Sequence, residues 1–377
     1  MAGRMHAHCA ATYVRYGPVE HVRHTCIGAH SALRPAHSAH LHLHRLSMIA
    51  SSSFARASSL AQRAASDHMR RRVRVGAAAA LTPAELSTAA SSPAAVGKPK
   101  FQYLSGWFCP YAHRATLALE HHAKRVEYDW VEALGWEQRD DAAGVTGTGK
   151  EWWYHWKSPQ LVRVNPSGLI PTLIPIDPNT NEPDESRPVY ESLVTVDFID
   201  AVSGATGVDR LVPEDPYEAA RMRVWADKLN KECCSPYYGV LVRKEDAERK
   251  EHFDKLISGL KAFSRELEKT SGPLLLADGQ LSSADLALVP WAYRYYVFEH
   301  YRGADYVIPE DDPELAAYHE WFNHVMALPS VARTLPDKER YLEHIGKYAD
   351  SSARSKVANA VRRGVAAHDL DDEKDEY

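Results

Sequence analysis

The sequence has few cysteines and no long apolar run. No stretch of about 18 apolar residues occurs among its 377 residues, so it offers no candidate for a membrane-spanning helix. Two of the five cysteines lie near the N-terminus, two are adjacent (Cys233 and Cys234), and Cys109 stands alone. Neither a disulfide framework nor a paired metal-ligand spacing emerges. This usage is typical of a reducing compartment, where a single thiol can serve in chemistry.

Acidic side chains are nearly absent from the first 100 residues, which hold 13 Lys and Arg but only Glu20, Asp67 and Glu85. The rest of the chain is acidic, with 32 basic and 47 acidic side chains, which argues against nucleic-acid binding. We interpret residues 1–97, rich in Ala, Ser and Arg, as a low-complexity transit peptide for a plastid or mitochondrion. If residues 1–97 are not a transit peptide, the protein is expected in the cytoplasm. The irregular spacing of its histidines favours solvated disorder over metal binding.

Strand and helix patterns alternate after the leader and then give way to helices alone. Apolar runs predict strands at 101–108, 126–132, 169–176 and 187–190, and helices at 110–123 and 191–202. We therefore expect an α/β thioredoxin-like domain over 98–204 and an all-α C-terminal domain over 212–345. The helical patterns of the second domain cover 216–242, 246–269, 283–300 and 313–327. A charged tail, 346–377, follows, in which 351–368 could form a last helix.

The junction between the first strand and the first helix carries the sharpest chemical signal. Pro110 suits the first position of a helix, so Cys109 is expected at the N-cap, facing unpaired backbone donors. Such a position stabilises a thiolate and predicts a lowered pKa, hence a nucleophile. The alternative is an inert, buried cysteine. Position 112 is Ala, so Cys109 has no neighbouring partner thiol, and an external thiol would have to resolve any disulfide that it forms.

Several motifs in this order resemble the glutathione transferase superfamily, in particular its cysteine-type omega class. The resemblance covers residue 101 to about residue 345. It rests on the segments CPYAHRATLALE (109–120), NPSGLIPTL (165–173), YESLVTVDFID (190–200), VPEDPYEAARMRVWADKL (212–229) and GPLLLADGQLSSADLALVPW (272–291).

The resemblance implies a catalytic role for Cys109 and a set of glutathione-binding residues: Phe108, Lys157, Ile170, Pro171, Glu191 and Ser192. A cis Ile170–Pro171 bond would present the backbone of Ile170 to the cysteinyl part of glutathione, whereas an ordinary trans proline is the alternative. Glu191 and Ser192 would hold the γ-glutamyl end, unless they merely cap a helix. Lys157 would contact the glycyl carboxylate, unless it is a surface lysine.

A cysteine at this position favours redox transfer over conjugation. We expect a glutathione-dependent thioltransferase or dehydroascorbate reductase that works through a Cys109–glutathione mixed disulfide, with glutathione as co-substrate. No metal or bound cofactor is expected. The other partner would be a small electrophilic or oxidised molecule, and a homodimer is possible by resemblance. Two alternatives remain: a glutathionyl-hydroquinone reductase, and a non-catalytic glutathione-binding module.

Three other segments carry weaker expectations. Ser282 and Asp285 form an S-x-x-D pattern before an apolar run, which predicts a structural helix cap. Residues 144–151 nearly match a phosphate-binding loop but end in Glu, so we interpret them as an insertion loop. The neighbouring aromatic residues would wall part of the second-substrate pocket: Trp152, Trp153, Tyr154 and Trp156.

Overall fold

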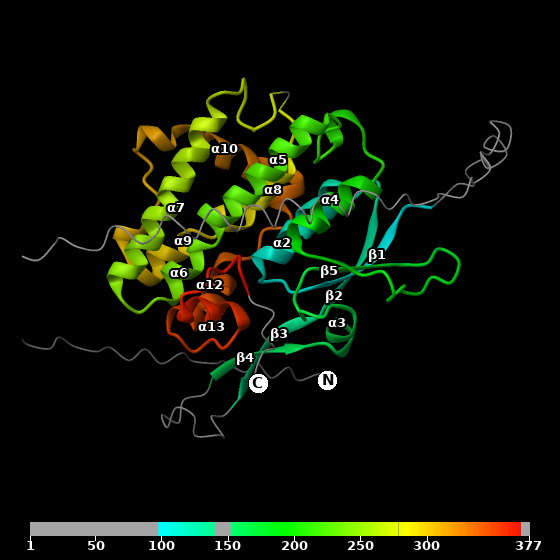
Figure 1. The fold of residues 1–377 in the computed structure, drawn as a ribbon, viewed down its shortest axis with the longest axis horizontal. Helices are drawn as coiled ribbons and strands as arrows, with labels where there is room; N and C mark the ends of the chain where they lie inside the picture. The colour runs from blue at the N-terminus through cyan, green and yellow to red at the C-terminus, as the bar shows by residue number, and fades with distance from the viewer. Residues whose placement is uncertain (1–96, 140–151, 278, 371–377) are drawn as a thin grey trace, which may run out of the picture. The chain divides into compact units, whose positions relative to one another are not determined.

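The computed structural model describes residues 97–139, 152–277 and 279–370 (Figure 1). Its first domain contains a four-stranded sheet in the order β2-β1-β5-β6, in which β1 pairs parallel with β2 and antiparallel with β5. The elements of this domain are β1 (Lys100–Ser105), α2 (Pro110–His121), β2 (Glu127–Glu132), β3 (Leu134–Arg139), β4 (Trp152–Lys157), α3 (Pro159–Val164), β5 (Thr172–Pro175), β6 (Val189–Tyr190) and α4 (Ser192–Val202). This is the expected thioredoxin-like domain.

Helix α2 lies between the sheet and the helical domain, packing against α4 and α8 (Ser283–Ala292). Pro110 occupies its first turn, and eight of its residues are buried, including Ala112, Ala115 and Leu119. Its N-terminus lies at the boundary between the two domains, because Cys109 and Tyr111 line one cavity with Tyr238 and Tyr341 of the helical domain. Cys109, the N-cap residue, is therefore held at that boundary.

The segment after β2 contains a hairpin, whereas the sequence predicted no strand between residues 133 and 168. Strands β3 and β4 pair antiparallel, with Leu134 opposite Lys157. All six residues of β4 are half-buried, because side chains cover parts of both its faces. Without a clean apolar–polar alternation, its aromatic-rich sequence carried no period-2 signal. The expected insertion loop at 144–151 lies outside the described residues.

The second domain is helical, as expected. Its described α-helices are α5 (Pro216–Leu229), α6 (Pro236–Val242), α7 (Asp246–Leu267), α8, α9 (Tyr296–Arg302), α10 (Ala316–Ala327), α11 (Pro329–Ala332), α12 (Lys338–Ala349) and α13 (Lys356–Arg363). A π-helical turn, η3 (Asn230–Cys234), joins α5 to α6. Short 3₁₀ turns complete the domain: η2 (Gly207–Asp209), η4 (Ala304–Tyr306) and η5 (Pro313–Leu315). None of the described helices is long and apolar enough to cross a membrane.

The C-terminal boundary differs from the expected one at residue 345, which falls inside α12. This helix buries Tyr341, His344, Ile345 and Tyr348, a spacing that places them on one face. The chain then continues through α13, so residues 346–370 belong to the folded domain. In Figure 1 these last helices lie beside the β3–β4 hairpin. An isolated bridge pairs Trp153 with Ala353, which ties the hairpin to the C-terminal segment.

Candidate functional site

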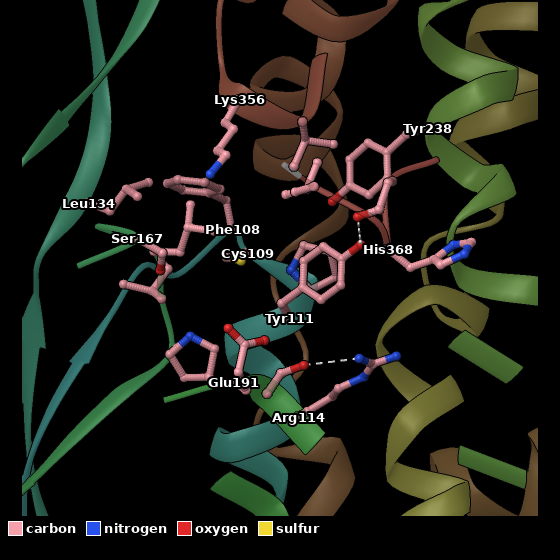
Figure 2. Close-up of a pocket in the computed structure, with 18 of the residues that line it drawn as sticks. Phe108, Cys109, Tyr111, Arg114, Leu134, Ser167, Glu191, Tyr238, Lys356 and His368 are labelled. Atoms are coloured by element: carbon pink, nitrogen blue, oxygen red, sulfur yellow. Dashed lines mark hydrogen bonds between the residues drawn. The ribbon is translucent and has the colours of Figure 1, made fainter. Parts of the chain in front are cut away.

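A cavity of about 290 Å³ opens at the boundary between the two domains, with Cys109 in its wall (Figure 2). One side consists of loops and helix starts of the first domain. The other side consists of side chains from α6, α12 and the C-terminal segment. The first-domain side includes Phe108, Cys109, Tyr111, Asn165, Ile170, Pro171, Glu191 and Ser192; the facing side includes Tyr238, Tyr341, His344, Tyr348, Lys356, Ala367 and His368.

Cys109 occupies the predicted N-cap, but its pKa shifts in the opposite direction to the one expected. Its backbone N–H donates to Gly106 O at 3.0 Å, and its carbonyl accepts from His113 N at 3.0 Å. Burial raises the pKa of the thiol, while the backbone amides of Ala112 and Tyr111 and the charges of Arg294 and Arg114 act to lower it. The net direction is upward. Desolvation thus outweighs the favourable helix terminus and the two arginine charges.

Glu191 and Ser192 lie at the start of α4, at one end of the cavity. Glu191 is exposed and has a φ of 70°, a left-handed conformation that is uncommon outside glycine and concentrates at functional sites. Ser192 is buried, and its hydroxyl accepts a hydrogen bond from Arg114 Nη1 at 3.0 Å (Figure 2). The two side chains therefore present a carboxylate and an oriented hydroxyl at the place where the γ-glutamyl end was expected.

The Ile170–Pro171 peptide bond is cis, as the resemblance implied. The loop before it is held by Asn165, whose side-chain amide donates to Leu169 O at 2.9 Å and to Thr172 Oγ1 at 3.0 Å. Among the described residues, the backbone of Ile170 takes part in no backbone–backbone hydrogen bond. Its N–H and C=O are thus available to an extended peptide lying along the cavity, as an added strand.

Phe108 and Lys157 take different positions. Phe108 lines the cavity and stacks on the His344 ring, with centroids 4.2 Å apart. Lys157 is not among the described residues that line the cavity, and its side chain packs over Gly168, next to the lining residue Ser167. A contact between Lys157 and a glycyl carboxylate would therefore take place at the edge of the cavity.

The structure brings into the site several residues that the sequence did not single out. Arg114, in the same motif as Cys109, is fully buried and donates only to neutral acceptors, among them Ala287 O and Asn230 Oδ1. The sequence could have indicated Arg114, because it follows Pro110 by one helical turn and so lies near Cys109. Burial lowers the pKa of His155 to about 3 and holds that of His344 well below its usual range. Both imidazoles therefore stay neutral in the cavity wall.

The expected aromatic wall from the insertion is wrong in its members. Of the described residues 152–157, only His155 lines the cavity. The guanidinium carbon of Arg354 lies 3.5 Å from the centroid of the Trp152 ring, and Lys347 Nζ lies 4.5 Å from the centroid of the Trp153 ring. These tryptophans face the C-terminal segment. The hairpin and the C-terminal segment meet only in the tertiary fold, so the sequence offered no sign of these contacts.

The remaining sequence motifs have structural positions. The capping box is present: Ser282 Oγ accepts from Asp285 N, and Asp285 accepts from Ser282 N at 2.8 Å. Asp285 also accepts from Trp321 Nε1 at 2.9 Å, deep in the helical domain. Cys233 and Cys234 are both fully buried in the π-helical turn, and burial raises the pKa of each thiol. We therefore assign them to packing.

Comparison with known proteins agrees with this geometry. Residues 108–202 match the family model described as the glutathione S-transferase N-terminal domain. The chain is 29% identical over 240 residues to glutathione transferase GST 23 of Zea mays, covering 63% of this chain and 90% of that one.

Two solved structures share the fold. Glutathione transferase Omega 3C of Trametes versicolor is 25% identical, with a TM-score of 0.50 and coverage of 67% of this chain and 91% of that chain. Rice GST1, solved in complex with glutathione, is 23% identical, with a TM-score of 0.52 and coverage of 67% and 98%.

The family model, the relatives and the fold together support the glutathione transferase superfamily for this chain. Within the superfamily the curated relatives are mostly Tau-class enzymes, whereas a cysteine at the helix N-cap was the basis of the omega resemblance.

Proposed function

We propose that this protein is a cysteine-type, omega-like glutathione transferase that reduces small glutathione mixed disulfides or dehydroascorbate through Cys109. The observation that supports it is the position of Cys109 in one cavity with Glu191, Ser192 and the free backbone of Ile170. A glutathione lying along these groups would place its sulfur next to a thiol rather than next to a hydroxyl.

The reaction proceeds in two exchanges. The Cys109 thiolate attacks the glutathionyl sulfur of a mixed disulfide, which forms a Cys109–glutathione disulfide and releases the substrate as a thiolate that takes up a proton. A second glutathione thiolate then attacks the glutathione sulfur of this intermediate, releasing glutathione disulfide and restoring Cys109. With dehydroascorbate, two glutathione molecules supply the two electrons. Glutathione is thus a co-substrate, and no bound cofactor is needed.

The upward pKa shift of Cys109 is compatible with this chemistry. Less thiolate is present at neutral pH, but the nucleophilicity of a thiolate increases with the pKa of its thiol. A higher pKa also makes Cys109 a poorer leaving group. Attack by the second glutathione on the mixed disulfide is therefore expected to be the slower exchange.

The test compares the full chain with the Cys109→Ser variant. We expect glutathione-dependent reduction of hydroxyethyl disulfide and dehydroascorbate by the unmodified protein, and a loss of at least about 100-fold in the variant with glutathione binding retained. Glutathione affinity is measured by calorimetry on both. Absence of turnover in the unmodified protein, with glutathione still bound, would overturn the reductase proposal and leave hydroquinone-conjugate reduction or a non-catalytic binding module.

Glutathionyl-hydroquinone reduction is the second candidate, and the aromatic cavity favours it. Tyr111, Tyr238, Tyr341 and Tyr348 line the cavity with Phe108, and buried His155 Nε2 has no hydrogen-bond partner among the described residues. A phenolic ring could fill this space and pair with that nitrogen. Release of hydroquinone from its glutathionyl conjugate, faster than disulfide reduction under the same conditions, would select this reaction.

The leader supports a proposal about location. Its basic, acid-poor composition suits import into a plastid or mitochondrion. A fusion of residues 1–97 to a fluorescent protein should reach one of these organelles, and a signal spread through the cytoplasm would refute import.

A further inference from the structure

Arg294 is a fully buried cation whose charge has no counter-charge among its hydrogen-bond partners. It lies in the turn between α8 and α9, with no exposed surface. Its Nη1 contacts His113 Nδ1 at 3.2 Å and donates to Pro290 O at 2.6 Å, and both partners are neutral acceptors. The other two nitrogens, Nε and Nη2, are buried without a hydrogen-bond partner among the described residues.

Such an arrangement is costly for folding. A buried guanidinium loses its hydration, and neutral acceptors and an aromatic face return only part of that loss. The guanidinium carbon of Arg294 lies 4.7 Å from the centroid of the Tyr341 ring, which is a partial compensation. Arg114 differs, since its guanidinium donates to Ala287 O, Ser192 Oγ and Asn230 Oδ1. An unsatisfied buried cation points to a role outside packing.

Two contacts connect Arg294 to the cavity. His113 is one turn after Cys109 on α2, and its backbone N–H donates to the Cys109 carbonyl. Tyr341, under the guanidinium, lines the cavity together with Cys109. Because His113 Nδ1 accepts from Arg294, the ring proton is on Nε2 and is donated to Thr334 Oγ1 at 2.8 Å. Burial keeps the pKa of His113 well below its usual range, so this ring adds no second charge.

The other groups around Cys109 leave the field of Arg294 largely uncompensated. The neighbouring tyrosines have raised pKa values and stay neutral, and the cavity histidines His155 and His344 have lowered ones and stay neutral. Among the charged groups, Arg114 is positive like Arg294. Glu191 and Lys356 in the cavity wall carry charges opposite to each other, so they largely cancel. Arg294 is the charge that most lowers the pKa of Cys109, ahead of Arg114.

We propose that Arg294 is a positioning residue that stabilises the anionic sulfur of Cys109, with its own charge left unpaired by the protein for that purpose. When Cys109 ionises, its sulfur gains a negative charge that acts electrostatically on a buried guanidinium whose hydrogen-bond partners are all neutral. The same field favours Cys109 as the departing thiolate when glutathione resolves the mixed disulfide. This inference rests on the proposed role of Cys109 but concerns the ionisation of its thiol, which can be measured without turnover.

The test is the pH profile of Cys109 alkylation in the full chain. Iodoacetamide is applied from about pH 6 to pH 10, and the modified Cys109 peptide is quantified by mass spectrometry, so the other cysteines do not interfere. We expect Arg294→Met to raise the apparent pKa by about one unit and to slow alkylation about tenfold at neutral pH. Arg294→Lys, which keeps the charge, should remain within about threefold of the unmodified protein.

Matched variants separate charge from structure. Lys250→Met removes an exposed cation that lies over the Phe253 ring, where solvent screens the charge, and should leave the profile within about 0.3 units. Arg294→Gln keeps side-chain donors without charge and repeats the test if the Met variant does not fold, as judged by thermal unfolding. A profile of a folded neutral variant that superimposes on that of the unmodified protein would overturn the proposal.

The outcomes also distinguish this inference from the proposed function. Slower alkylation in Arg294→Met, together with no reductase turnover in the unmodified protein, would retain the ionisation role and reject the reaction. Turnover that depends on Cys109, together with an unchanged alkylation profile in Arg294→Met, would retain the reaction and reject the ionisation role.

Discussion

At the scale of single residues, the reactivity of Cys109 depends on opposing contributions from its surroundings. The N-terminus of α2 supplies backbone amides, and two buried arginines supply positive charge, yet burial raises the pKa of the thiol. A raised pKa means that the thiol is mostly protonated at neutral pH. The thiolate fraction then grows about tenfold with each pH unit until the pKa is reached.

This shift predicts a rising pH profile. Reduction by Cys109 should become faster from pH 6 to pH 8, by up to about tenfold per unit, because the thiolate is the attacking species. Single-turnover transfer of glutathione from a mixed disulfide to Cys109, followed by mass spectrometry, measures this step alone. A rate that is flat over this range would show that the thiol is already ionised, contrary to the effect of burial.

At the scale of elements, the β3–β4 hairpin and the C-terminal segment depend on each other. Arg354 N donates to Trp153 O at 2.7 Å, and Trp153 N donates to Ser352 O at 3.1 Å. Farther along, Ala367 O accepts from Tyr111 OH at 3.1 Å across the cavity (Figure 2). The segment 351–370, which contains α13, is therefore fastened at both ends and forms one side of the cavity.

We expect loosening of the first attachment to widen access to Cys109. Arg354→Ala removes the guanidinium stacked on Trp152, a contact of about 0.5–1 kcal/mol. The ratio of Cys109 alkylation by a bulky maleimide to that by iodoacetamide should rise about threefold. Lys338→Ala, which removes a cation from the face of Tyr296, is the control. An unchanged ratio in the Arg354 variant would mean that this attachment does not limit access.

At the scale of the whole molecule, α4 and α5 carry three of the exposed large apolar side chains among the described residues. Tyr217 and Val224, seven residues apart on one face of α5, are 75% and 66% exposed, and Val194 on α4 is 54% exposed. The Arg223–Asp197 ion pair, at 2.7 Å, joins the two helices. Single exposed apolar residues are ordinary, but a group on adjacent helices is typical of a protein interface.

This surface is one that the homodimer implied by the resemblance could use, and it predicts how to disrupt that dimer. Tyr217→Glu combined with Val224→Asp should weaken dimerisation at least tenfold, because charges would be buried in the interface. Light scattering over a dilution series measures the change. Val307→Asp, an exposed residue elsewhere, should have little effect. A monomeric unmodified protein at micromolar concentration would refute the interface.

Features that depend on a few consecutive residues were predictable from the sequence. Pro110 after Cys109 and the Ser282–Asp285 cap each specify a local backbone form by themselves. The cis Ile170–Pro171 bond and the Glu191–Ser192 turn were implied by the resemblance, and all four are found where expected. The division into an α/β domain and a helical domain followed from periodicity for the same reason.

Only the tertiary structure decided what surrounds these local forms. The pairing of Arg294 with His113, 181 residues apart, and of Trp153 with Ala353 leaves no trace in a local pattern. Side chains of α6 and α12 face Cys109 across the cavity, and burial turns a favourable helix terminus in the sequence into a raised pKa in the folded protein. The sequence by itself determined which residue carries the thiol, whereas long-range packing decided its ionisation, because burial and buried charge depend on segments distant in the chain.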